Sequence, residues 1–249
     1  MTRMKMFFSL VLVLVLATGS SLMAQKSSKS FVVQKGGKKI EGRISAAPNG
    51  RVTISTQSGN LSLNPGQYEY VVTPKPDEVE ELEDLLDDES YNKLAEKAPA
   101  VFEKYKYLGW ADTVARLQCE GLLALNRKAD AEKILAAAKK LPRADEFNLT
   151  SAELQLLVHD KKLEDVEKKL NAMMGAEDDA VMAFVFNMRG RVNEMQGNKK
   201  EAVLQYLKTF LVFEDKKKFR RFRKEAKANA LRLMKELKDP TAQILEGLK

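Results

Sequence analysis

Residues 185–213 read VFNMRGRVNEMQGNKKEAVLQYLKTFLVF, and the spacing of large and small side chains in this stretch indicates the fold. Phe186 is followed four positions later by Gly190, and Ala202 is followed four positions later by Tyr206. Residues four apart lie on one face of an α-helix. The stretch therefore predicts two antiparallel helices that approach closely where Gly190 and Ala202 face each other.

The same pattern recurs upstream at a nearly constant interval. Ala131 and Val166 occupy the position of Ala202 in earlier copies, and the successive intervals are 35 and 36 residues. In the last copy Gly197 supplies the turn, because glycine accepts left-handed backbone angles at little cost. Self-similarity at such a period is typical of stacked helical repeats. The sequence thus predicts an array of helical hairpins.

This spacing resembles the tetratricopeptide repeat, whose period is about 34 residues. The likeness covers about one full repeat well, and a related helical-hairpin solenoid would show a similar pattern. Arrays of this kind bind other proteins far more often than they catalyse reactions. The resemblance therefore implies an all-α array, with a period like that of the tetratricopeptide family, that binds a protein partner of unspecified identity.

In that family the first helix of each hairpin lines the concave face of the array. The resemblance therefore implies that partner-contacting residues lie on those helices. They are Arg116 and Glu120 in one hairpin and Asn187, Arg191 and Glu194 in another. The carboxylate clamp that some members use for chaperone tails has Lys and Asn where this chain has Arg116 and Glu120. We therefore do not expect recognition of that kind of tail.

Residues 25–76 predict a small β-rich module ahead of the array. Apolar and polar residues alternate in 51–55 and 60–63, and turn residues separate four or five short strands. The glycine and isoleucine spacing that begins at Gly37 resembles the SH3-like or Sm-like barrels that precede repeats in some exported bacterial proteins. We expect a barrel-like module or a strongly bent sheet, either as a ligand-binding barrel or as a cap on the first helices. The predicted fold class is therefore α+β.

The first 24 residues have the features of a secretory signal peptide. Arg3 and Lys5 precede an apolar run, and small residues lead to a cleavage site after Ala24. The apolar run is short for a membrane span, although an uncleaved anchor is the alternative. After cleavage we expect no transmembrane segment and an exported protein, in the periplasm or outside a bacterial cell. The single cysteine, Cys119, excludes an internal disulfide.

Two blocks of opposite charge flank the repeats. Residues 77–89 contain nine carboxylates and no basic residue, and their leucine spacing predicts an amphipathic acidic helix before a repeat domain at 90–249. Near the other end, 216–227 reads KKKFRRFRKEAK. A strongly curved array would bring the two blocks together within one chain, and a straighter one would let them meet between chains as oligomers.

The basic block is a second candidate binding surface. Its candidate residues are Lys217, Arg220, Arg221 and Lys224. The interpretations are a solvated helix face, or a docking surface for an acidic protein, an anionic envelope polymer or lipid headgroups. The interleaved phenylalanines continue a buried helical stripe, and export removes most nucleic acid from reach. We therefore expect no nucleic-acid binding.

The sequence contains no recognisable catalytic constellation. His159 is the only histidine and lies where a helix is expected to end, which predicts a surface residue. Cys119 occupies a small-residue position of a repeat helix, which predicts burial rather than reactivity. We expect no enzyme activity, no metal and no cofactor. The favoured function is an exported scaffold or adaptor that binds a protein through its array. The alternative is a peripheral envelope protein held to an anionic surface.

Overall fold

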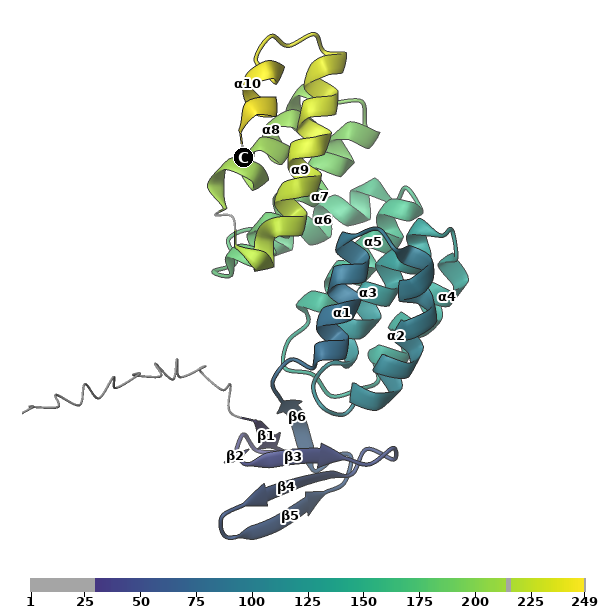
Figure 1. Cartoon of the computed structure of the whole chain (residues 1–249), viewed down its shortest axis with the longest axis vertical. Helices are drawn as coiled ribbons and strands as arrows, with labels where there is room; N and C mark the ends of the chain where they lie inside the picture. Colours follow the sequence, from purple (N-terminus) through teal and green to yellow (C-terminus); the bar gives the residue numbers. More distant parts are fainter. Residues whose placement is uncertain (1–29, 214–215, 249) are drawn as a thin grey trace, which may run out of the picture.

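The computed structural model describes residues 30–213 and 216–248. Its described residues fold into a small β module followed by an α-helical array, which confirms the predicted α+β class (Figure 1). The predicted signal peptide and its cleavage site lie outside the described residues.

Two three-stranded antiparallel sheets make up the β module. The first has the order β2 (Lys39–Glu41), β1 (Phe31–Gln34), β6 (Tyr68–Val72), and the second has the order β3 (Arg43–Ala46), β4 (Val52–Thr56), β5 (Gly59–Leu63). The β4–β5 hairpin covers the two stretches of alternating residues, and Gly59, the first residue of β5, follows its two-residue turn with a φ of 126°.

Gly42 alone separates β2 from β3, so a single bent segment contributes to both sheets. A Cβ atom at Gly42 would lie 2.5 Å from the Ser55 carbonyl oxygen, which shows how closely the backbones approach at the bend. Val32 and Ile54 are fully buried in the core between the sheets. Among the described residues, strand pairing stays within each sheet. The closed barrel is therefore not found, and the strands form two separate three-stranded sheets joined by the bend at Gly42.

The helices of the described region follow one another as five antiparallel pairs. The pairs are α1 (Asp77–Asp87) with α2 (Tyr91–Tyr105), α3 (Ala111–Ala124) with α4 (Lys128–Ala138), α5 (Phe147–His159) with α6 (Leu163–Met173), α7 (Asp179–Met195) with α8 (Lys199–Val212), and α9 (Lys217–Glu236) with α10 (Ala242–Gly247). The acidic helix predicted at 77–89 is α1, and it packs in the same core as α2 and α3.

One turn geometry joins the helices of every pair. A residue with positive φ ends the first helix at Glu89, Asn126, Lys161, Gly197 and Lys238. At each turn two backbone amides donate back to the helix end, as when Gly197 N donates to the Glu194 carbonyl at 3.0 Å and Asn198 N to the Asn193 carbonyl at 2.8 Å. Within the described residues one unit therefore repeats five times, although only one of the five positions is the glycine that the sequence makes visible.

Helix α2 runs unbroken through Pro99. Proline removes one backbone hydrogen bond from a helix. Pro99 lies on the exposed side of α2, where water can solvate the carbonyl left without a partner. The first hairpin is therefore complete, with α1 as its first helix and α2 as its second.

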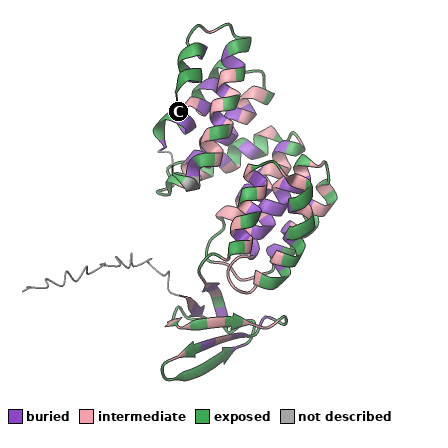
Figure 2. Ribbon diagram, viewed as in Figure 1, coloured by how far each residue is buried: buried purple, intermediate pink, exposed green. Residues whose placement is uncertain are grey.

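The predicted close approach in the fourth pair is present, with a different partner at its centre. Ala202 is fully buried, but the nearest neighbours of a Cβ at Gly190 would be ring atoms of Tyr206, at 2.5–2.8 Å. Tyr206 lies one turn beyond Ala202 on α8, so its ring covers the space that the missing side chain leaves. Apolar side chains continue between the pairs as buried layers (Figure 2).

The β module docks on the loop between α2 and α3. Gly109 has a φ of 88°, and a Cβ atom there would clash with the carbonyl oxygen of Val71 in β6. The indole Nε1 of Trp110 donates to Thr73 Oγ1 at 3.0 Å, and that hydroxyl donates to the Leu108 carbonyl at 2.8 Å. Trp110 also packs against the first helical core at this junction.

A charged cleft between the inner helices

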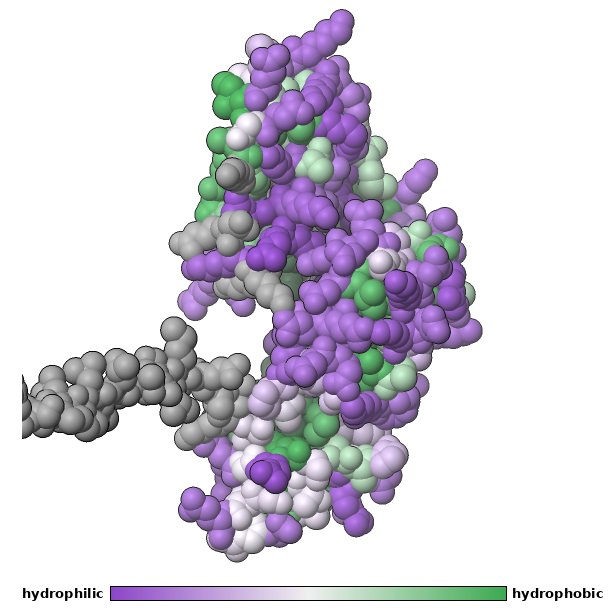
Figure 3. Space-filling view, in the orientation of Figure 1, coloured by the Kyte–Doolittle hydropathy of each residue, from purple (hydrophilic) through white to green (hydrophobic). Residues whose placement is uncertain are grey.

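The first helices of all five pairs converge on one cleft of about 530 Å³. The α1–α2 turn and the start of α2 complete its wall. Its lining residues are Leu86, Asp87, Glu89, Tyr91, Glu120, Leu123, Ala124, Gln155, His159, Arg191, Arg221, Lys224, Glu225, Ala228 and Asn229. Hydrophilic side chains dominate the surface around α9 and α1 (Figure 3). The cleft therefore presents charge at the inner face of the array.

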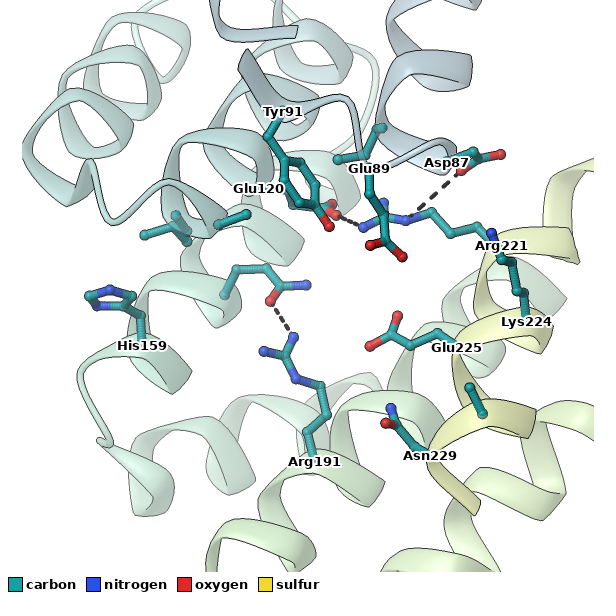
Figure 4. Close-up of a pocket in the computed structure, with 15 residues that line it drawn as sticks. Asp87, Glu89, Tyr91, Glu120, His159, Arg191, Arg221, Lys224, Glu225 and Asn229 are labelled. Atoms are coloured by element: carbon teal, nitrogen blue, oxygen red, sulfur yellow. Dashed lines mark hydrogen bonds and ion pairs between the residues drawn. The ribbon is translucent and has the colours of Figure 1, made fainter. Parts of the chain in front are cut away.

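Arg221 joins the last hairpin to the first two across this cleft. Its guanidinium is 2.6 Å from a Glu120 carboxylate oxygen on α3 and 3.9 Å from an Asp87 oxygen on α1 (Figure 4). Arg116 Nη1 also donates to Glu120, at 2.9 Å. We call Arg116, Glu120, Asp87 and Arg221 the clasp. Through it the acidic and basic blocks meet within one chain, in the contact expected of a strongly curved array.

The two carboxylates of the clasp respond to their surroundings in opposite ways. The side chain of Glu120 is only 8% exposed, and burial alone would raise its pKa. The Arg221 and Arg116 guanidiniums outweigh that effect and hold the pKa of Glu120 below its usual value. Burial raises the pKa of Asp87 more than the more distant Arg221 lowers it. Glu120 is therefore the carboxylate that Arg221 neutralises.

Further polar side chains point into the cleft beside the clasp. Figure 4 shows the carboxylates of Glu89 and Glu225, the hydroxyl of Tyr91 and the guanidinium of Arg191 around one space. Arg191 Nη1 donates to Gln155 Oε1 at 2.6 Å. Burial raises the pKa of Tyr91, and the Glu89 and Glu225 carboxylates raise it further against the opposing charge of Arg221. The phenol therefore lies in a locally negative environment.

Four of the nine predicted contact residues line the cleft. Glu120 comes from α3, Arg191 from α7, and Arg221 and Lys224 from α9. The sequence assigned them to two separate surfaces, the groove and the basic block. The structure brings them to one site because the array curves until α9 faces α3.

Three other predicted contact residues are buried between helices or are hydrogen-bonded to neighbouring side chains. Asn187 is 3% exposed, so its predicted place on the groove is wrong: α7 is packed against α6, α8 and α9 and leaves little of its surface free. Arg116 binds Asn148 Oδ1 at 2.9 Å as well as Glu120. Glu194 accepts from Tyr206 and from Arg232, at 3.2 and 2.6 Å. The last two support neighbouring helices and are not among the residues that line the cleft.

Outside the cleft, α9 combines an exposed basic face with a buried stripe. Arg220 is exposed, and the side chain of Lys217 lies outside the described part of the structure. Phe219 is 3% exposed, and the ring of Phe222 packs edge-on against Phe184 with centroids 6.1 Å apart. Both rings are engaged in packing, as the helical spacing of the sequence predicted, so neither ring is presented for base stacking.

Several residues that line the cleft were not predicted from the sequence. Glu89, Tyr91, Gln155, Glu225 and Asn229 were not among its candidates. For α9 a signal was present, because Arg221, Glu225 and Asn229 are spaced four apart and share one helix face. The turn residue Glu89 carried no such signal, since its position depends on how the first and last hairpins meet.

The described residues contain no group of histidine, cysteine and carboxylate side chains able to hold a metal ion. His159 is exposed at the last position of α5, as predicted, and it also lines the cleft. Cys119 is fully buried, as predicted, and burial raises the pKa of its thiol to about 12, with a further contribution from Glu120. In residues 30–213 and 216–248 every helix is too short or too polar to cross a bilayer.

The chain matches no family model, no curated protein and no solved structure. Function must therefore be inferred from the site itself.

Proposed function

We propose that this chain is an exported, non-enzymatic scaffold whose helical array binds an extended segment of a protein partner in the charged cleft. One observation carries the proposal: the first helices of all five pairs turn their side chains toward a single cleft. Helical solenoids use such inner surfaces to bind other proteins. The likeness of the sequence to tetratricopeptide repeats supports the same function, and export rests on the leader sequence alone.

The chemistry of the cleft suits a peptide better than a small apolar ligand. Its lining includes carboxylates, guanidiniums, an amide and a phenol, beside a few apolar side chains. An extended peptide offers backbone donors and acceptors together with charged side chains. The cleft has no concentrated apolar wall, which drug-sized ligand sites usually have.

The basic block now favours this function over adhesion to an anionic surface. Arg221 is ion-paired with Glu120 and Asp87, and Lys224 lines the cleft. The Arg221 charge is therefore engaged inside the array, and Arg220 and Lys224 are the exposed basic candidates on α9. A protein partner held in a half-enclosed cleft would stay bound at moderate salt, whereas surface tethering through exposed charges would be screened.

A peptide-display selection against the purified protein tests the proposal. Ala228 is an exposed cleft residue on α9, so Ala228→Trp should fill the cleft without disturbing the helical core. Ala137→Trp makes the same change at an exposed position on α4 outside the cleft. We expect selected peptides to bind the unmodified protein and Ala137→Trp, and to lose at least about tenfold in affinity for Ala228→Trp. Equal binding to all three proteins would contradict the proposal.

A further inference from the structure

Glu89 and Glu225 face each other across the cleft, each beyond ion-pair distance of a described cation, while Glu225 still raises the pKa of Arg221. Glu89 comes from the α1–α2 turn and Glu225 from α9, and both carboxylates point into the same space (Figure 4). Neither forms an ion pair with another described residue, while the nearby Glu120 is held by two guanidiniums. A carboxylate in a partly enclosed site gains free energy from a cation that it can reach.

Tyr91 and a few apolar side chains lie beside these carboxylates. The ring of Tyr91 is half-buried, and Leu86, Leu123, Ala124 and Ala228 line the same cleft. A long basic side chain has two parts, an aliphatic stem that prefers apolar surface and a charged end that prefers carboxylates or an aromatic face. The cleft supplies matching surfaces for both parts.

The remaining cations are placed so that they leave these carboxylates available. Arg221 is bound to Glu120 and Asp87, and Arg191 is bound to the Gln155 amide. In Figure 4 the Arg191 guanidinium lies across the space from Glu225, where it can meet a carbonyl or carboxylate of the same ligand. The cleft therefore has a negative side and a positive side.

From this arrangement we propose that the cleft contains a subsite for a lysine or arginine side chain of the bound segment, between Glu89 and Glu225. The proposal rests on the proposed function and specifies its partner: the segment carries a basic residue at the position that enters this subsite. Tyr91 and the neighbouring apolar side chains hold the stem, and Arg191 contacts the backbone or an acidic neighbour of that residue. A segment with an acidic side chain at this position is excluded by charge repulsion.

The test uses the amide of acetyl-lysine as the probe and the amide of acetyl-norleucine as its uncharged counterpart. Both are titrated into the isotope-labelled full chain and followed by the backbone amide signals of Glu89, Tyr91 and Glu225. We expect saturable shifts with the lysine probe and much weaker ones with norleucine. Equal shifts with the two probes would overturn the proposal, because the stem alone would then account for binding.

Substitutions of the two glutamates test whether their carboxylates bind the charged end of the lysine probe. Glu89→Gln and Glu225→Gln should each weaken lysine-probe binding by about fivefold, a typical effect for one partly screened ion pair. Glu96→Gln removes an exposed carboxylate from α2 outside the cleft and should leave binding unchanged. Unchanged spectra outside the cleft show that each variant is folded. Binding that is unaffected in both cleft variants would overturn the proposal.

Different results would contradict the proposed peptide-binding function and the proposed subsite for a basic side chain. If display selects peptides that Ala228→Trp excludes, yet the lysine probe is not distinguished from norleucine, then the cleft binds segments and the basic subsite is wrong. If the lysine probe binds as expected and no peptide is selected, the subsite stands and the function as a peptide-binding scaffold is wrong.

Discussion

The packing inside the fourth hairpin and the clasp across the cleft hold the array together in different ways. In the hairpin, Gly190 lies against the Tyr206 ring with no room for a side chain, and Ala202 is fully buried. In the clasp, Arg221 reaches Glu120 and Asp87 with a long side chain that is 30% exposed. The first contact leaves no space for an added atom, whereas the second depends on charge and on side-chain torsions that can rotate. Hence we expect substitutions in the hairpin to cost more stability than substitutions in the clasp.

The largest effect should come from overfilling the hairpin. Ala202→Arg places a long charged side chain in a fully buried position and should lower the free energy of unfolding by on the order of 3 kcal/mol or more. Leu204→Arg makes a similar change two residues away, at a position that is 58% exposed, and should have little effect. Urea denaturation measures both. An unchanged stability in Ala202→Arg would show that the hairpin register is wrong.

The junction with the β module should behave like the hairpin, because backbone atoms form it. Gly109→Ala would add a Cβ against the Val71 carbonyl and strain a φ of 88°, which should cost on the order of 2 kcal/mol. Gly175 has a similar φ of 84° with open space around it, so Gly175→Ala isolates the backbone strain, about 1 kcal/mol. The fluorescence of Trp110, the only tryptophan, reports the junction directly. Equal losses in the two variants would mean that the contact with Val71 contributes nothing.

Removing the buried carboxylate of the clasp should have a moderate effect. Glu120→Ala leaves Arg116 and Arg221 without their shared partner and should cost about 1–2 kcal/mol, since Arg221 remains partly solvated. Because the pKa of Glu120 is lowered on folding, its contribution is present above the ordinary glutamate pKa and is lost as the pH falls through the lowered value. The difference between the two proteins should therefore shrink at acidic pH. A difference that is constant with pH would show that the carboxylate acts only through packing.

The smallest effect should come from the contact between Asp87 and Arg221, which is the longer of the two contacts that Arg221 makes in the clasp. The pKa of Asp87 is raised, so its contribution to stability is present below the ordinary aspartate pKa and is lost as the pH rises through the raised value. Asp87→Asn should therefore stabilise the protein at neutral pH, by on the order of 0.3 kcal/mol after solvent screening, and have no effect in acid. Thermal denaturation at the two pH values is the measurement. A loss of stability at neutral pH would mean that the contact with Arg221 outweighs the cost of burying the charge.

The repeated hairpins were visible in the sequence because packing between neighbouring helices is local. Ala131, Val166 and Ala202, spaced almost evenly in the sequence, are all fully buried on the second helices of their pairs. The first hairpin was less visible, because the acidic segment 77–89 was assigned to a helix ahead of the repeats, whereas it is the first helix of that hairpin. The short strands of the β module also followed from local signals, namely strand alternation and glycine turns, whereas their division into two sheets did not.

The cleft was less predictable, because it depends on contacts between distant hairpins. The sequence showed that 77–89 and 216–227 carry opposite charges. It did not show that Arg221 forms its shortest ion pair with Glu120, which lies in neither block. Asn187 was misplaced because the number of helices packed against α7 cannot be read from a single repeat. Repeat spacing alone therefore assigns least well the residues whose surroundings depend on distant helices.

The docking of β6 also has a mechanical consequence. Strand β1 is hydrogen-bonded to β2 on one side and β6 on the other, so a force applied near Phe31 passes across the sheet into β6. From β6 it reaches the array by two routes, along the chain into α1 and through Thr73 and Trp110 into the start of α3. A pull on the N-terminal end would therefore load the first two hairpins in parallel, and the junction at Trp110 would have to shear before α1 carried the whole tension.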